Sequence, residues 1–195
     1  MTVSIALLHY PVLNRFGDTI ASAVTNLDIH DLARLARTYG ISRFFVVTPI
    51  AEQQDLVREL VGHWTGSGAV ANPDRKSAME LVSIATDLHE VREMIQKKAD
   101  YTEPMRIYAT SARWETCPKT VPWHVVREEM TMKRRHGLIL FGTASGLSEE
   151  VMGEVDGILP PIRGVGEYNH LSVRAAAAIT LDRLFGENRR WGYAK

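Results

Sequence analysis

Three short runs of the sequence are almost entirely apolar and are bounded by residues typical of turns. They cover Val3–His9, Phe44–Thr48 and Leu138–Gly142. Apolar runs of this length without alternation indicate strands of a parallel sheet covered on both faces, because neither face of such a strand meets water. Two further runs, Leu81–Thr86 and Met105–Thr110, are predicted to add strands to the same sheet.

The segments between these runs carry their apolar residues at helical spacing. In residues 26–39 the apolar positions recur at i, i+3, i+4 and i+7, which gives a helix one apolar face. That face consists of Ile29, Leu32, Ala33 and Ala36, and Gly40 follows as a residue that commonly ends helices. The same reasoning predicts helices over Ala51–Trp64, Asp87–Ala99, Trp123–His136 and Asn169–Phe185, the last with Asn169 as its N-cap.

Strands that alternate with helices predict an α/β fold, with a mostly parallel sheet and helices on both faces. Near the C-terminus we expect a short helix over Ser148–Met152 and a strand around Val155–Leu159. Thr65–Asp74, which reads TGSGAVANPD, is expected to be a loop.

The composition is that of a globular protein: 45% of the 195 residues are hydrophobic and 24% are charged. This length fits a single domain over residues 1–195, with a core that needs neither disulfides nor metals. The single cysteine, Cys117, excludes an internal disulfide and suits the reducing cytoplasm. The N-terminal apolar run is too short to span a membrane and follows no basic segment, so we expect neither a signal peptide nor a membrane partner.

Two kinds of catalytic site are disfavoured by spacing. Seven scattered histidines and one cysteine offer no ligand pattern, so no metal is expected. Ser145 lies between Ala144 and Gly146, and Gly142 lies three residues before it rather than two. A hydrolase nucleophile elbow needs G-x-S-x-G, which leaves a small α/β hydrolase as a weak alternative.

The last third of the chain holds two loops that suit a ligand. The first, Gly142–Leu147, follows a predicted strand, and the second, Pro160–Gly164, leads towards the last helix. Glycines let the backbone approach a ligand closely, and the N-terminus of a helix favours a carboxylate. Such loops could hold an adenine ring and an amino-acid carboxylate, or they could be structural turns without a ligand.

The order of these motifs resembles the SpoU branch of the SPOUT superfamily of RNA methyltransferases. That pattern reads G-S-E-G-x-G-L, then I-P-M-x-G, then S-L-N-V-S-V-A-A-A. Here the corresponding segments are Gly142–Leu147, Leu159–Gly164 and Asn169–Ala177. The sequence departs from the pattern at Ala144-Ser145, which replace Glu-Gly, and at Tyr168–Leu171, where the asparagine is shifted.

The resemblance implies S-adenosylmethionine as the cofactor, a deep trefoil knot over about residues 138–186, and a homodimer. It implies methyl transfer to tRNA or rRNA, at a ribose 2′-oxygen or a base nitrogen. A non-catalytic knotted module that binds the cofactor or RNA is the alternative. The residues expected to bind the cofactor are Thr110, Gly142, Thr143, Gly146, Leu147, Leu159, Ile162, Gly164, Asn169, Leu171 and Ser172.

The segment from Thr25 to Gly40 resembles the first SpoU motif, N-x-G-x-x-x-R-T-A-x-x-F-G, with Arg34 on the motif arginine. At ~100° per residue, four polar side chains share one face of this helix. We expect a catalytic role for three of them. A guanidinium stays protonated, so Arg34 would clamp a phosphate and stabilise a developing alkoxide while His30 takes the proton. The polar face consists of Asn26, His30, Arg34 and Arg37, of which the first three are the catalytic candidates.

A purely structural interpretation of this helix stays open. Thr25 and Asp28 would form a capping box, and Asp31 would pair with Arg34 on the surface. In the functional interpretation, the resemblance implies that the arginine of one subunit serves the site of the other.

Contact with RNA must come from local patches, because the net charge is zero and the sequence pI is near 7.1. The basic residues expected to contribute are Arg37, Arg113, Lys133, Arg134, Arg135 and Arg163.

Overall fold

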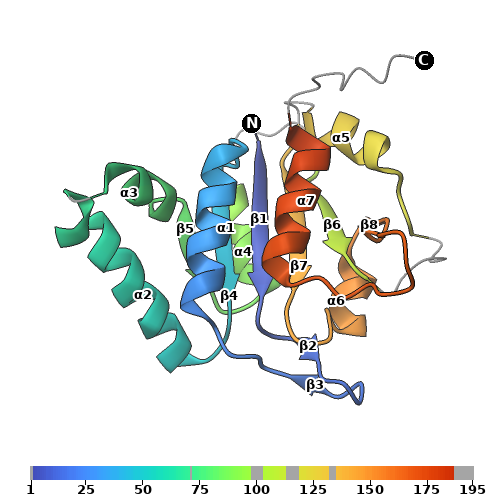
Figure 1. The fold of residues 1–195 in the computed structure, drawn as a ribbon, viewed down its shortest axis with the longest axis horizontal. Coiled ribbons are helices and arrows are strands. Elements are labelled where there is room, and N and C mark those ends of the chain that lie inside the picture. The colour runs from blue at the N-terminus through green and yellow to red at the C-terminus, as the bar shows by residue number, and fades with distance from the viewer. Residues whose placement is uncertain (1, 71, 98–102, 113–118, 132–134, 187–195) are drawn as a thin grey trace.

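The computed structural model describes residues 2–70, 72–97, 103–112, 119–131 and 135–186. Its centre is a six-stranded sheet in the order β5-β4-β1-β7-β6-β8, and every strand pair in it is parallel (Figure 1). The predicted strands are confirmed, each within about two residues. They are β1 (Val3–Leu8), β4 (Arg43–Val47), β5 (Val82–Ala85), β6 (Arg106–Thr110), β7 (Gly137–Gly142) and β8 (Gly157–Leu159).

Helices cover both faces of the sheet, as the sequence predicts. Alternate residues of a strand point to opposite faces, so Ile5 and Leu7 of β1 pack into one core while Ala6 and Leu8 pack into another. The first core is closed by α1 (Asn26–Thr38), α2 (Ala51–Thr65), α3 (Pro73–Met79), α5 (Trp123–Thr131) and α7 (Val173–Phe185), and the second by α4 (Leu88–Gln96) and α6 (Glu149–Glu154).

The face of α1 that the sequence predicts to be apolar is the buried one. Ile29, Leu32, Ala33 and Ala36 are each fully buried. The helix lies between α7 on one side and α3 on the other (Figure 1). The exposed residues of α1 are Asn26, Leu27, Arg34, Arg37 and Thr38.

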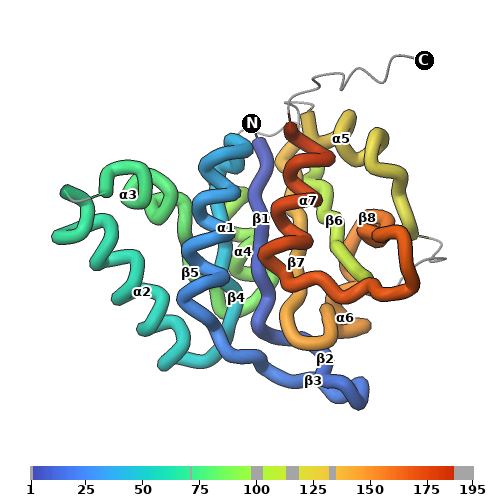
Figure 2. The backbone as a smooth tube through the Cα atoms, viewed as in Figure 1, coloured from blue at the N-terminus to red at the C-terminus, as the bar shows by residue number. Residues whose placement is uncertain are grey.

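The last helix begins later than the sequence indicates. Its N-cap is Ser172, whose Oγ accepts the N–H of Ala175 at 3.3 Å, so the prediction of Asn169 as the cap was wrong. Asn169 instead donates its side-chain Nδ2 to the carbonyl of Ala112 at 3.1 Å. The chain between β8 and α7 crosses the carboxyl ends of the strands before α7 turns back along the sheet (Figure 2).

Two other boundaries differ from the prediction. The helix that starts at Trp123 ends at Thr131, and His136 lies directly before β7. The predicted loop Thr65–Asp74 contains a 3-10 turn, Ser67–Ala69, and the start of α3. Asn72 caps that helix and Pro73 occupies its first turn, a pairing that favours helix initiation.

A small hairpin, β2 (Val12–Leu13) and β3 (Thr19–Ile20), was not predicted. Strands of two residues are too short to show alternation. The trefoil knot stays a prediction, since strand order and pairing alone do not establish threading.

Candidate functional site

A cavity of about 520 Å³ opens where the carboxyl ends of β6, β7 and β8 meet the start of α7. Ligands of parallel α/β sheets bind at this edge, where loops and helix N-termini converge. The wall is formed by Ser22–Ala23, Thr110–Ala112, Phe141–Gly146, Leu159–Pro160, Ile162 and Asn169–Val173, together with Thr25, Asp28, Trp123, Ala176 and Thr180.

The structure brings most of the predicted cofactor residues to this one wall. Leu147 is buried beside this wall and forms an isolated antiparallel β-bridge with Val12. It lines a smaller neighbouring cavity of about 190 Å³. Gly164 is exposed and is not part of the wall. The nine that line the cavity are Thr110, Gly142, Thr143, Gly146, Leu159, Ile162, Asn169, Leu171 and Ser172.

The loop after β7 folds back on itself so that its backbone forms part of the wall. The N–H of Gly146 donates to the carbonyl of Thr143 at 2.9 Å, and Gly146 has a φ of +112°, a conformation that favours glycine. A Cβ atom on Gly142 would lie 2.9 Å from the backbone nitrogen of Leu147. A side chain at Gly142 would therefore push the loop out of position.

Hydrogen bonds tie this loop to the interior of the sheet. Thr143 Oγ1 donates to the carbonyl of Leu8 at 2.9 Å and lies 2.5 Å from Ser22 Oγ, which lies 3.0 Å from His9 Nδ1. Because the Thr143 hydroxyl proton is used by Leu8, the Ser22 hydroxyl donates to Thr143 and His9 donates to Ser22. Burial lowers the pKa of His9 to about 4, against a smaller opposing effect of Asp28, so the ring is neutral near pH 7.

Asp28 is the one cavity residue with a formal charge among the described residues at the wall. Its Oδ2 accepts the Thr25 hydroxyl at 2.6 Å, while its N–H donates to Thr25 Oγ1 at 3.2 Å, so the predicted cap is confirmed. Its Oδ1 lies 3.3 Å from Arg174 Nε. The other side of this guanidinium contacts Asp31 at 3.2 Å, so the predicted pairing of Asp31 with Arg34 was wrong.

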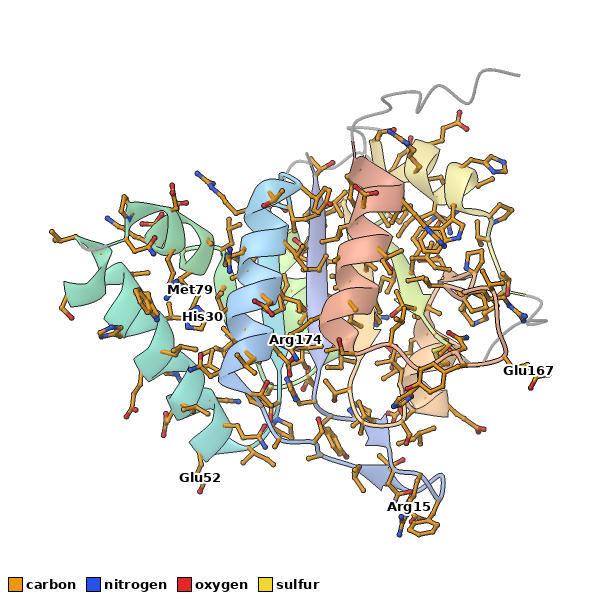
Figure 3. All side chains as sticks on the ribbon, in the orientation of Figure 1. Arg15, His30, Glu52, Met79, Glu167 and Arg174 are labelled. Carbon is orange, nitrogen blue, oxygen red and sulfur yellow. The ribbon has the colours of Figure 1, made fainter. Side chains whose placement is uncertain are left out.

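Arg174 thus links α7 to two carboxylates of α1 beside the cavity. Figure 3 shows its side chain between these two helices, near their ends on the cavity side. Arg174 and Asp31 remain partly exposed, whereas the Asp28 side chain is 15% exposed. The link therefore lies at the edge of the cavity, with Asp28 as its inner member.

The three predicted catalytic residues do not line the cavity. His30 points towards α2 (Figure 3), where its ring lies edge-on to Trp64 with the ring centroids 5.6 Å apart. Burial, followed by the positive charge of Arg75, lowers the pKa of His30. Asn26 and Arg34 are exposed. The N-cap Thr25 and Asp28 of α1 line the wall instead.

The predicted RNA-binding residues are spread over the molecule. Arg37 is exposed on α1, and Arg163 is exposed in the loop after β8. The guanidinium of Arg135 pairs with Glu103 at the amino end of β7, the edge of the sheet opposite the cavity. Arg113, Lys133 and Arg134 lie outside the described residues.

Several wall residues carry no signal in the sequence. Ser22 lies in an extended segment after the hairpin, and the Asp28 position reads as a helix cap. Trp123 begins α5 and receives the Arg183 guanidinium over its ring at 5.1 Å. Only the close approach of α1, α5 and α7 makes these side chains neighbours.

A sequence model of the family described as SAM-dependent RNA methyltransferase matches residues 2–186. The chain belongs to this family. The enzyme class, S-adenosylmethionine as its cofactor and the predicted resemblance to a family of RNA methyltransferases are thereby confirmed.

Similar proteins agree with this assignment. A protein of Aquifex aeolicus is 43% identical over 188 residues, which cover 96% of this chain and 90% of that protein. A tRNA (guanine-N(1)-)-methyltransferase of Oleidesulfovibrio alaskensis is 42% identical over 183 residues, 93% of this chain. A protein of the same description from Nitratidesulfovibrio vulgaris is 40% identical. The chain spans 41% of the length of each of these two methyltransferases.

Solved structures share the fold. TrmJ from Z. mobilis ZM4 superposes with a TM-score of 0.61 at 16% identity, covering 95% of this chain and 70% of that one. The SpoU methyltransferase AviRb from Streptomyces viridochromogenes, in complex with AdoMet, gives 0.58 at 14% identity, covering 93% and 56%. The fold is therefore that of SpoU-type methyltransferases.

In the part of the chain that the structure describes, no helix is long and apolar enough to cross a membrane. No group of three or more His, Cys, Asp or Glu side chains in the same residues could hold a metal ion.

Proposed function

We propose that the cavity holds S-adenosylmethionine and that its methyl group passes to a nucleotide of tRNA or rRNA at the cavity mouth. One observation carries this proposal. Nine of the eleven residues expected from four separate sequence segments line a single cavity at the carboxyl edge of the sheet. Its volume of about 520 Å³ lies in the range of small-molecule sites.

The wall suits the chemistry of this cofactor. Phe141, Leu159 and Ile162 offer apolar surface for an adenine ring, and the backbone of the loop after β7 offers amides and carbonyls to its edge. The carboxylate of Asp28 complements a ligand that carries positive charge. S-adenosylmethionine supplies a methyl group already activated on a sulfonium, so the protein has mainly to position the acceptor and exclude water.

Asp28 is also the group of this chain that is best placed to accept the proton that the acceptor loses. It lies on the wall, and Thr25 and Arg174 orient its two oxygens. A fixed carboxylate within reach of an acceptor can act as a general base. In this proposal, Asp28 is the proton acceptor, the role that the sequence pattern suggested for His30. The ring of His30 lies between α1 and α2 instead.

Arg34 and Asn26 would act across a homodimer. Both are exposed on α1, so a second subunit docked against this helix could receive them. The same proposal includes the knot over about residues 138–186, one domain over residues 1–195 and a cytoplasmic location. The acceptor in this proposal is a ribose 2′-oxygen or a base nitrogen. It is not narrowed to N1 of guanine, because the two relatives described as tRNA (guanine-N(1)-)-methyltransferases are more than twice as long as the segment that they share with this chain.

Gly142→Ala tests the cofactor site. A methyl group at this position would displace the loop after β7, and we expect S-adenosylmethionine affinity to fall about tenfold or more by calorimetry. Gly153→Ala in α6 is the matched control, because a Cβ there meets nothing within 4 Å. Unchanged affinity in Gly142→Ala would contradict the assignment of the cavity.

Methyl transfer itself is measured on total RNA from a strain that lacks the protein, followed by mass spectrometry of nucleosides. A new methylated nucleoside is expected with wild type and a reduced yield with Gly142→Ala. Cofactor binding without any transfer would support the non-catalytic module instead.

A further inference from the structure

An aromatic side chain stands exposed at the tip of the β2–β3 hairpin. Phe16 keeps 74% of its surface accessible, and the guanidinium carbon of Arg15 lies 4.6 Å from the centre of its ring. Figure 3 shows Arg15 at the outer end of the hairpin, away from the sheet. A cation beside an open aromatic face is a combination that binds unpaired nucleotides.

Phe16 lies in a turn whose backbone is held by hydrogen bonds. Asn14 Oδ1 accepts the N–H groups of Phe16 at 2.8 Å and of Asp18 at 3.0 Å, while Asn14 Nδ2 donates to Asp18 Oδ2 at 3.0 Å. The backbone N–H of Asn14 donates to the carbonyl of Asp18 at 2.9 Å, and Gly17 has a φ of +92°. These bonds hold the backbone of the turn that carries Phe16, while the apolar ring itself stays exposed to water.

The hairpin is also fixed to the cavity. The N–H of Leu13 donates to the carbonyl of Gly146 and the N–H of Ser145 donates to the carbonyl of Leu13, both at 2.8 Å. The N–H of Ser148 donates to the carbonyl of Pro11 at 3.3 Å. These bonds join the hairpin to the loop after β7, so the tip holds a set position relative to the cavity mouth.

We propose that Phe16 and Arg15 form a stacking platform for an unpaired base of the RNA substrate that flanks the nucleotide at the cavity. The base would lie on the open face of Phe16, and Arg15 would meet a neighbouring phosphate. With zero net charge, the protein needs such local contacts to hold RNA. This inference rests on the proposed function, because it assumes that the acceptor is a nucleotide of RNA.

Phe16→Ala is the direct test, with Phe16→Trp as the conservative variant and Val70→Ala as the control. Val70 is 93% exposed and lies just after the 3-10 turn that follows α2. Binding is measured by fluorescence anisotropy with a labelled single-stranded oligoadenylate and with unfractionated tRNA. We expect Phe16→Ala to weaken binding roughly tenfold, while Phe16→Trp and Val70→Ala stay within about threefold of wild type.

Four readouts distinguish the possible failures: S-adenosylmethionine affinity, oligomeric state, RNA binding and methyl transfer. S-adenosylmethionine affinity and oligomeric state are expected to be unchanged in Phe16→Ala. If wild type binds RNA and transfers methyl groups but Phe16→Ala binds RNA equally well, the platform is overturned and the proposed function stands. If Phe16→Ala changes the oligomeric state, the ring contacts a second copy of the chain, and the platform is likewise overturned. If wild type neither binds nor methylates RNA, both proposals fail.

Discussion

Two buried histidines belong to the framework of this enzyme rather than to its chemistry. His9 donates to Ser22 below the cavity, and His136 Nε2 lies 2.9 Å from Ser4 Oγ at the opposite edge of the sheet. Burial lowers the pKa of both to about 4, with the charge of Arg43 contributing at His136. Both rings are therefore uncharged in the folded protein near neutral pH.

These pKa values predict that stability falls in mild acid. In the unfolded chain a histidine binds its proton with a pKa of ~6.5, so between pH 6.5 and 4 the unfolded state holds more protons than the folded one. The contribution of the two neutral histidines to the free energy of unfolding is therefore fully present above pH 6.5 and is lost as the pH falls below that value. We expect each histidine to contribute on the order of 1–2 kcal/mol to the loss between pH 7.5 and 5.

Urea unfolding at several pH values measures this effect. His9→Gln and His136→Gln would each remove part of the pH dependence, and the double variant would remove most of it. A wild-type protein equally stable at pH 7.5 and 5 would show that neither histidine resists protonation.

At the scale of elements, the pairing of α1 with α7 shapes one side of the cavity. Arg174 of α7 contacts both Asp28 and Asp31, but only Asp28 belongs to the cavity wall. The two carboxylates are therefore a matched pair for separating a structural role from a chemical one.

We predict that Asp31→Asn and Asp28→Asn each lower stability by up to about 1 kcal/mol, since the pairs with Arg174 are partly solvent-exposed. Only Asp28→Asn should slow methyl transfer, by roughly 100-fold or more in kcat, because removal of a general base acts on the chemical step. Thermal unfolding and single-turnover kinetics provide the two readouts. Equal rates for the two variants would exclude Asp28 as the base.

At the scale of the whole molecule, the position of Arg34 raises the question of which subunit it serves. Arg34 is exposed on α1 and does not line the cavity of its own chain. Co-expression of Arg34→Ala and Gly142→Val chains with different tags would yield mixed dimers. If Arg34 acts on the partner's cavity, one site of each mixed dimer is intact, and activity should return from nearly none to about half of wild type in purified mixed dimers.

The result distinguishes two arrangements. If Arg34 acts within its own subunit, both sites of the mixed dimer carry a defect and activity stays absent. A purified chain that is monomeric in sedimentation would contradict the dimer altogether.

The elements that the sequence predicted are those whose pattern is local. The uniformly apolar strands and the apolar face of α1 follow from periodicity, and the structure confirms them. The β2–β3 hairpin was missed because its two-residue strands show no periodicity, and the start of α7 was missed because a distant contact decides it. Asn169 is as good a cap as Ser172 by composition, but its side chain is used by Ala112, which lies 57 positions away.

The candidate site likewise combines features that the sequence predicts with features that only the tertiary structure decides. By itself, the sequence determined the strand-and-helix pattern, the family and the loops expected at the cofactor, because those loops are contiguous motifs of glycine and polar residues. Tertiary structure alone decided that Asp28 faces the cavity, that His30 packs on Trp64, and that the first strand of the hairpin is hydrogen-bonded to the loop after β7. The physical reason is that helical spacing defines the faces of α1, whereas the packing of α3 and α7 against it decides what each face meets.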